Sequence, residues 1–250
     1  MKIISVATQK GGEGKTTTAS AILYALTQRG YKTLGVDLDP QRNLTKLVSA
    51  DDKTKSVLGV LTGEIDISDA IQNTEFGDIL PSTQMLAILE ASPQSDTLLK
   101  TALKSLKGYD YVVIDNPPAL GCMTRNSLTC ADYVVIPVQA DIDGLQGLTD
   151  LYGSIATARR NGNEKLKVAG ILLTRFQGRT NLSKNIKSQL QHIADRLGTV
   201  LFRSTIRESV AVKESRYRRV PLLGSEYRRE GVCADYNDFI EELIQIVEEV

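Results

Sequence analysis

The chain contains few of the residues that build disulfide frameworks and metal centres. Its 250 residues include three cysteines, one histidine and no tryptophan. The cysteines, Cys122, Cys130 and Cys233, lack the close pairing of a zinc site, so neither a zinc centre nor a disulfide framework is predicted and a reducing compartment is expected. The single histidine, His192, excludes a multi-histidine metal site, and we expect it at the solvated surface.

Long apolar segments are also missing. No hydrophobic run approaches the roughly 20 residues that a membrane-spanning helix needs. The N-terminus enters a strand-like segment without the charged and then apolar pattern of a signal peptide, so a cytoplasmic protein is expected. With 42% hydrophobic content and no linker-like or repetitive segment, the chain is predicted to form a single domain over residues 1–250.

Charge is balanced overall but not locally. The chain has 30 basic and 30 acidic residues, which gives a formal net charge of zero. Between Leu201 and Val232, however, eight basic residues stand against four acidic ones, whereas Cys233–Val250 has six acidic residues and no basic one. This asymmetry allows a local electrostatic footprint for an anionic partner despite the neutral total.

Short β-branched apolar segments recur along the chain and alternate with helical-looking stretches. Strands that are apolar on both faces are typical of a parallel sheet covered by helices on both sides. We therefore predict an α/β fold with a doubly wound, mostly parallel sheet, whose ligands gather at the carboxyl ends of the strands. The predicted strands are Ile3–Ala7, Thr33–Val36, Asp78–Leu80, Tyr111–Ile114, Tyr133–Pro137, Val168–Leu173 and Val200–Ile206, and the predicted helices are Lys15–Gln28, Asp66–Ile71, Met85–Leu89, Ile186–Leu197 and Tyr236–Val250.

The segment Gln9–Thr18 carries the most chemical information. It follows the first apolar strand and opens a helix, and its glycines allow backbone N–H groups to turn around an anion at the positive end of that helix. Lys15 can reach the β- and γ-phosphates of a nucleotide, and the Thr16 hydroxyl can bind Mg²⁺. A P-loop usually has a glycine six positions before the lysine, where this chain has Gln9. The predicted nucleotide-binding residues are Lys10, Gly11, Gly12, Glu13, Gly14, Lys15, Thr16 and Thr17.

The pattern Lys-Gly-Gly-x-Gly-Lys-Thr-Thr at residues 10–17 resembles the deviant Walker A box of the ParA/MinD/NifH class of P-loop ATPases. The resemblance runs from Lys2 to about Leu222 and favours the ParA/Soj branch. It implies an ATP-dependent DNA-partitioning ATPase, acting in plasmid or chromosome segregation, with ATP and Mg²⁺ as cofactors. Four further segments match in order and approximate spacing: Val36–Gln41, the Walker B-like Tyr111–Gly121, Val135–Gln139 and Leu172–Leu182.

The resemblance also implies roles for acidic residues that follow the strands. Thr16 would bind Mg²⁺ directly and Asp115 would hold it through a water molecule. Asp39 would orient the water that attacks the γ-phosphate, while Asp37 would support the metal shell. The predicted catalytic residues are therefore Lys10, Lys15 and Asp39, and the predicted metal site comprises Thr16, Asp37, Asp39 and Asp115.

Two loop residues bear on the switch that this family implies. The family's counterpart of Lys10 reaches across a two-fold interface to the partner's nucleotide, which implies an ATP-dependent homodimer. Glu13 stands where the family commonly has a small or apolar residue. An acid beside the triphosphate repels it by roughly 1 kcal/mol or more unless it points away or pairs with a cation. Slow hydrolysis that a ParB-like partner stimulates is also implied.

Basic residues in the last third of the chain suggest contact with DNA. Arg179 matches a ParA/Soj arginine that contacts DNA non-specifically, whereas Ala211 stands where the family tends to have another. Neighbouring basic residues can replace it because phosphate contacts read charge and not base identity. The implied protein is cytoplasmic and nucleoid-associated. The predicted DNA-binding residues are Arg179, Arg203, Arg207, Lys213, Arg216, Arg218 and Arg219.

Two other members of the class remain as alternatives. A MinD-like membrane-associated positioning ATPase would need a basic amphipathic C-terminal helix. Ile240–Val250 is acidic, and anionic lipids would repel it, so no membrane partner is expected. A NifH-like reductase would need cysteines that hold a shared cluster, and Cys122 and Cys130 do not match their positions.

Overall fold

A single sheet of eight strands lies at the centre of the computed structural model, which describes residues 1–51, 55–91, 95–139, 142–177 and 181–249. The strand order is β3-β4-β2-β5-β1-β6-β7-β8, and neighbouring strands are parallel except for the antiparallel pair β3 and β4. The predicted doubly wound, mostly parallel α/β fold is confirmed. The strands are β1 Lys2–Val6, β2 Thr33–Asp37, β3 Gln72–Thr74, β4 Gly77–Leu80, β5 Tyr111–Asp115, β6 Tyr133–Gln139, β7 Lys167–Phe176 and β8 Leu201–Arg207.

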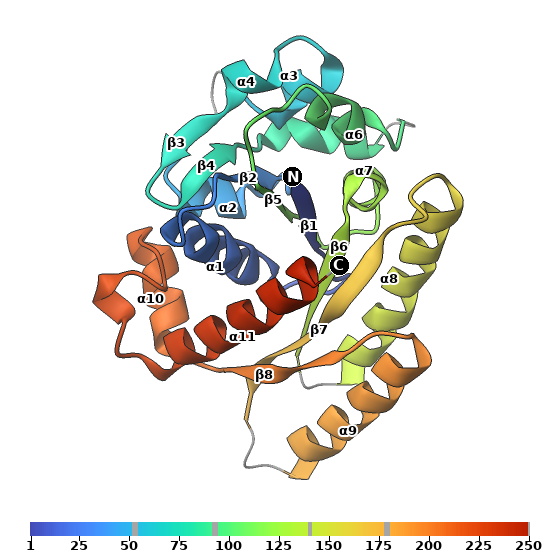
Figure 1. The fold of residues 1–250 in the computed structure, drawn as a ribbon, viewed down its shortest axis with the longest axis vertical. Helices are drawn as coiled ribbons and strands as arrows, with labels where there is room; N and C mark the ends of the chain where they lie inside the picture. The colour runs from blue at the N-terminus through green and yellow to red at the C-terminus, as the bar shows by residue number, and fades with distance from the viewer. Residues whose placement is uncertain (52–54, 92–94, 140–141, 178–180, 250) are drawn as a thin grey trace.

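Helices cover both faces of this sheet (Figure 1). Successive residues of a strand point to opposite faces, and on β1 Ile3 belongs to one hydrophobic cluster while Ile4 belongs to the other. The Ile4 face carries α1 (Lys15–Gln28), α10 (Val210–Arg218) and α11 (Gly231–Glu248). The Ile3 face carries α3 (Val57–Thr62), α4 (Ile67–Ala70), α5 (Ala87–Ala91), α6 (Leu98–Leu103), α7 (Cys122–Cys130), α8 (Ile142–Arg160) and α9 (Asn181–Arg196).

The longer predicted elements are confirmed with small shifts at their ends. Helix α1 has the predicted bounds, whereas α11 begins at Gly231 and not at Tyr236. His192 is exposed on α9, as expected. The predicted helix Met85–Leu89 is a 3-10 turn, η1 (Gln84–Leu86), followed by α5. Strand β3 and the helices α2 (Asn43–Leu47), α3, α6, α7, α8 and α10 were not among the elements predicted with bounds.

The sheet brings the ends of five strands to one edge. Val6 of β1 is in register with Asp115 of β5, which in turn is in register with Asp37 of β2. On the other side of β1, Gln139 of β6 is in register with Thr174 of β7. Ligands of open α/β sheets bind outside this carboxyl edge, so the edge is where a site is expected. Among the described residues, none of the helices is both long and apolar enough to cross a bilayer.

Candidate nucleotide-binding site

A phosphate-binding loop connects the end of β1 to the start of α1. Gly12 and Gly14 have φ angles of 85° and 94°, which L side chains rarely adopt, so both positions require glycine. Gly14 is the N-cap of α1, and no side chain caps this end of the helix. The first N–H groups of α1 are therefore left to a ligand, and the helix dipole favours an anion there.

Lys15 is folded back over this loop. Its Nζ donates hydrogen bonds to the carbonyl oxygens of Thr8 and Lys10, each at 3.1 Å. Burial lowers the pKa of the Lys15 ammonium group, and the carboxylates of Asp115 and Glu13 oppose that shift. The side chain is 7% exposed, so an anion in the loop would meet a largely desolvated cation, whose attraction is stronger than it would be in water.

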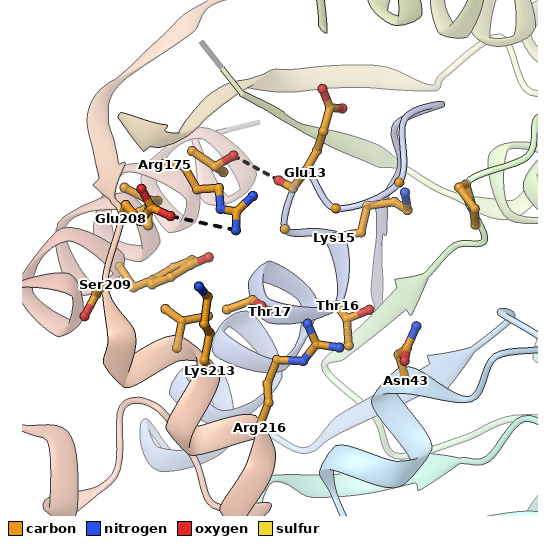
Figure 2. Close-up of a pocket in the computed structure, with 18 of the residues that line it drawn as sticks. Glu13, Lys15, Thr16, Thr17, Asn43, Arg175, Glu208, Ser209, Lys213 and Arg216 are labelled. Carbon is orange, nitrogen blue, oxygen red and sulfur yellow. Dashed lines mark hydrogen bonds and ion pairs between the residues drawn. The ribbon is translucent and has the colours of Figure 1, made fainter. Parts of the chain in front are cut away.

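Glu13 does not face the phosphate side of the loop. Figure 2 shows its carboxylate pointing away from Lys15 and Thr16. It accepts a hydrogen bond from the Thr8 hydroxyl, while Glu13 Oε1 has no hydrogen-bonding partner among the described residues. The side chain is 1% exposed, and this burial raises its pKa. The repulsion that the sequence suggested is therefore reduced, because the acid lies beneath the loop and not beside the bound anion.

Asp37 and Asp39 have different surroundings at the end of β2. Asp37 is fully buried and accepts hydrogen bonds from the Asp39 amide at 3.0 Å and from the Thr45 amide and hydroxyl, both at 2.8 Å. Burial raises its pKa to about 6, although the hydrogen bonds from Thr45 oppose the shift. Asp39 accepts one hydrogen bond from the Gln41 amide and lines the pocket described below. Asp37 thus fixes the backbone that presents Asp39.

Asp115 and Thr16 provide the surroundings that fit Mg²⁺. Asp115 is fully buried at the end of β5, and neither of its carboxylate oxygens has a hydrogen-bonding partner among the described residues. Burial and the nearby Asp37 raise its pKa well above the usual value, while Thr16 opposes the shift. A cation would neutralise this carboxylate. Among the described residues, no three His, Cys, Asp or Glu side chains form a metal-binding cluster.

The loop opens into a pocket of about 440 Å³ (Figure 2). This volume falls in the range of roughly 300–1,000 Å³ that is typical of small-molecule sites. One side is formed by Asp39 and Pro118, which follow β2 and β5. The opposite wall comes from the end of β8, from α10 and from Tyr236 of α11, and includes the apolar Ile206 and Val212. The pocket therefore extends from the phosphate-binding loop to a partly apolar wall that suits the nucleoside end of a nucleotide.

The predicted DNA-binding residues that the structure describes lie partly in the nucleotide pocket and partly on the exposed surface. Arg179 lies outside the described residues. Arg207, Lys213 and Arg216 line the nucleotide pocket. The exposed Arg219 is the C-cap of α10 and makes no ion pair among the described residues. Three of the arginines pair with carboxylates: Arg203 with Glu242 at 3.6 Å, Arg207 with Asp235 at 2.7 Å and Arg218 with Glu226 at 2.8 Å. Their role in DNA binding stays a prediction.

Sequence reasoning missed the residues that brace the loop from the neighbouring strands. Gln139 Nε2 donates to the Gly12 carbonyl at 2.7 Å, and the Thr174 hydroxyl donates to the Glu13 carbonyl at 2.9 Å. Arg175 lines the pocket with a φ of 50° and lies 3.9 Å from Glu208. Gln139, Thr174 and Arg175 lie in segments that match the ParA/Soj branch in their order along the chain. Their position in these segments was the one sign in the sequence that they belong to the site.

The glycine-rich loop, the strand-end carboxylates and the parallel sheet define a P-loop nucleotide-binding protein. Comparison with known proteins narrows this class. A family model described as "AAA domain" matches residues 1–168. The chain is 34% identical over 239 residues to the sporulation initiation inhibitor protein Soj of Bacillus subtilis, covering 92% of this chain and 93% of that protein. It is 36% identical over 214 residues to the chromosome-partitioning ATPase Soj of Thermus thermophilus, covering 85% and 83% of the two chains.

A solved structure with the same fold is that of cobyrinic acid a,c-diamide synthase from Mycobacterium smegmatis with a bound ATP analogue and magnesium. It has a TM-score of 0.84 and 32% identity and covers 98% of this chain and 95% of the other. The chain belongs to the ParA/Soj family of P-loop ATPases. It is a partitioning ATPase with ATP and Mg²⁺ as cofactors.

Proposed function

We propose that the protein is an ATP-switched ATPase that partitions a plasmid or a chromosome by binding DNA non-specifically as an ATP-dependent homodimer. The observation that carries the proposal is the geometry of the phosphate-binding loop. Lys15 lies over it, Glu13 points away, and Gly11 and Gly12 are exposed at the surface. The exposed side of the loop leaves room for a second subunit to cover the nucleotide.

Dimerisation is assigned to Lys10 at the edge of this exposed surface. Lys10 is a second cation close to Lys15 in the same loop. It would stabilise the phosphates of the nucleotide bound by the partner subunit, as an arginine finger does. An isologous two-fold interface then holds two nucleotides, each contacted by both subunits. ATP becomes the link between the subunits, and its hydrolysis to ADP and phosphate releases them.

Hydrolysis is assigned to the carboxylates at the sheet edge. The Thr16 hydroxyl and Asp115 would hold Mg²⁺, which neutralises charge on the phosphates when it is bound. Asp39 would orient the attacking water, whose oxygen bonds to the γ-phosphorus as the bond to the ADP oxygen breaks. Asp37 keeps Asp39 in place through its backbone. The unaided rate is expected to be slow, and a ParB-like protein resets the dimer by accelerating hydrolysis.

DNA contact is assigned to Arg179 together with the surface arginines Arg203, Arg218 and Arg219. Arg218 and Arg219 are exposed near Tyr217, which is 90% exposed. The ion pairs of Arg203 and Arg218 are at the surface, where such pairs contribute little, so phosphates can replace the carboxylates. Binding of this kind neutralises phosphates without reading bases, and it places the protein on the nucleoid.

The central experiment measures binding of the purified protein to duplex DNA and to anionic liposomes, each with ATP, ADP and no nucleotide. DNA binding that requires ATP and does not depend on sequence supports partitioning. ATP-dependent liposome binding without DNA binding contradicts it and supports a membrane-positioning ATPase. The four acidic residues of Ile240–Val250, Glu241, Glu242, Glu248 and Glu249, disfavour that result because anionic lipids would repel them.

A triple substitution, Arg179→Glu with Arg218→Glu and Arg219→Glu, tests the DNA surface. It should weaken DNA binding while ATP-dependent dimerisation persists, and it should flatten the salt dependence by about 0.9 in log–log slope for each phosphate that is no longer neutralised. The matched control reverses two exposed arginines outside the predicted set, Arg228→Glu with Arg229→Glu. If the triple variant binds DNA as tightly as the wild type, these arginines do not form the DNA-binding surface.

A further inference from the structure

We propose that Lys213 and Arg216 of α10 form a second cationic contact for the bound nucleotide and hold its α-phosphate. This inference rests on the nucleotide site of the proposed function and adds residues to it. Neither residue belongs to the predicted phosphate-binding loop, and the sequence suggested DNA for both. Their place in the pocket wall points instead to the nucleotide.

Helix α10 is fixed so that these two side chains enter the pocket. The Ser209 hydroxyl caps its start by accepting a hydrogen bond from the Ala211 amide at 3.2 Å. Ala211 and Ser215 are buried against the body of the protein. Residues three apart share one side of a helix, so Lys213 and Arg216 project together. Figure 2 shows both pointing from α10 into the pocket, with the Arg216 guanidinium directed toward Thr16 at the start of α1.

The charges of these two residues are not compensated, unlike those of other arginines around the pocket. Arg207 is bound by Asp235 through two hydrogen bonds of 2.7 Å, and Arg175 lies 3.9 Å from Glu208. Lys213 and Arg216 make no ion pair among the described residues. Glu208 lines the same wall, but its ion pair is with Arg175, so the two unpaired cations of α10 favour an anionic ligand between them and the opposite wall.

The position of Lys213 and Arg216 along the pocket indicates which phosphate of the nucleotide they contact. The terminal phosphates belong to the loop and Lys15, because these provide the inward N–H groups and the buried ammonium group. The nucleoside fits the apolar wall of Ile206 and Val212. The α-phosphate joins these two ends, and Arg216 is directed at the first turn of α1 between them. A guanidinium group can give such a phosphate two parallel hydrogen bonds, whereas an ammonium group acts as a point charge.

The test compares dissociation constants for ADP, ATP and AMP, measured by calorimetry with Mg²⁺ and without DNA. The variants are Arg216→Ala, Lys213→Ala and the double substitution. Arg218→Ala is the matched control, since it removes an arginine of the same helix that lies outside the pocket lining. Arg216→Ala should weaken binding of all three nucleotides by about tenfold, equivalent to ~1.4 kcal/mol, with a smaller loss for Lys213→Ala. Arg216→Lys should recover part of the affinity, and Arg218→Ala should bind as the wild type does.

The binding results distinguish a failure of this inference from a failure of the proposed nucleotide-binding function. Lys15→Ala serves as the reference variant, because it removes the cation of the loop itself. Loss of ADP binding in Lys15→Ala with wild-type affinity in the double α10 variant overturns the inference and leaves the nucleotide site intact. Wild-type ADP affinity in Lys15→Ala instead overturns the phosphate-binding loop. A double variant that binds nucleotide normally but loses DNA at saturating ATP returns Lys213 and Arg216 to the DNA surface.

Discussion

Replacing Glu13 by glutamine is expected to stabilise the folded protein at neutral and alkaline pH. The carboxylate is buried beneath the phosphate-binding loop, and one of its oxygens lacks a hydrogen-bonding partner among the described residues. A neutral amide of nearly the same shape can still accept the hydrogen bond from Thr8. Because an unsatisfied buried group costs about 1–3 kcal/mol and a charged one more, the free energy of unfolding should rise by about 1–2 kcal/mol in Glu13→Gln at pH 8.

The sign of the pH dependence follows from the raised pKa of Glu13. An acid whose pKa is higher in the folded state than in the unfolded state stabilises the fold only while it is protonated. Below the ordinary value of 4.5 the carboxyl group is protonated in both states, so the wild type and Glu13→Gln should differ least there. As pH rises from 4.5 through the folded-state pKa, the wild type loses stability relative to the variant, and the difference then stays constant.

Chemical denaturation of both proteins at a series of pH values measures this difference. Subtraction removes the contributions of Asp37 and Asp115, whose pKa values are also raised by burial. At this chain length, each kcal/mol corresponds to about 2–4 °C in Tm. Glu214→Gln is the matched control, because it removes a carboxylate from an exposed position. A Glu13→Gln variant that is no more stable than the wild type at pH 8 would show that the charges of Lys10 and Lys15 fully compensate the buried carboxylate.

Three further substitutions test the site and its support. Asp39→Ala should bind ATP and dimerise but release phosphate far more slowly, and undiminished phosphate release would transfer its role to another acid, first Asp37. Lys10→Ala should bind ATP as a monomer, which light scattering with ATP would show; a full dimer contradicts the two-nucleotide interface. Gly121→Ala should lower the free energy of unfolding by about 1 kcal/mol in denaturant titrations, because an added Cβ displaces Glu90, whose carboxylate accepts hydrogen bonds from the first amides of α7. Unchanged stability would mean that this cap contributes nothing.

The sequence determined the features that local chemistry specifies. Glycines at positions 12 and 14 are needed where φ is positive, so the amino-acid pattern was enough to identify the loop. Helix Lys15–Gln28 and the central strands are long or uniformly apolar, and their pattern predicted them within a few residues. The edge strand Gln72–Thr74 was missed because it is short, polar and held only by its pairing with β4.

Only the tertiary structure decided where individual side chains point. Glu13 could face the phosphates or the interior, and its burial beneath the loop depends on Thr8 from the end of β1. The sequence alone placed Lys213 and Arg216 on a basic surface. It shows how many charges a segment carries, but not which side of the helix packs against the rest of the protein. Because Ala211 and Ser215 pack against the body of the protein, the side chains of Lys213 and Arg216 point into the pocket. The phosphate-binding loop of the same pocket comes from the other end of the chain. Such contacts between distant segments form only when the chain folds, and no local pattern encodes them.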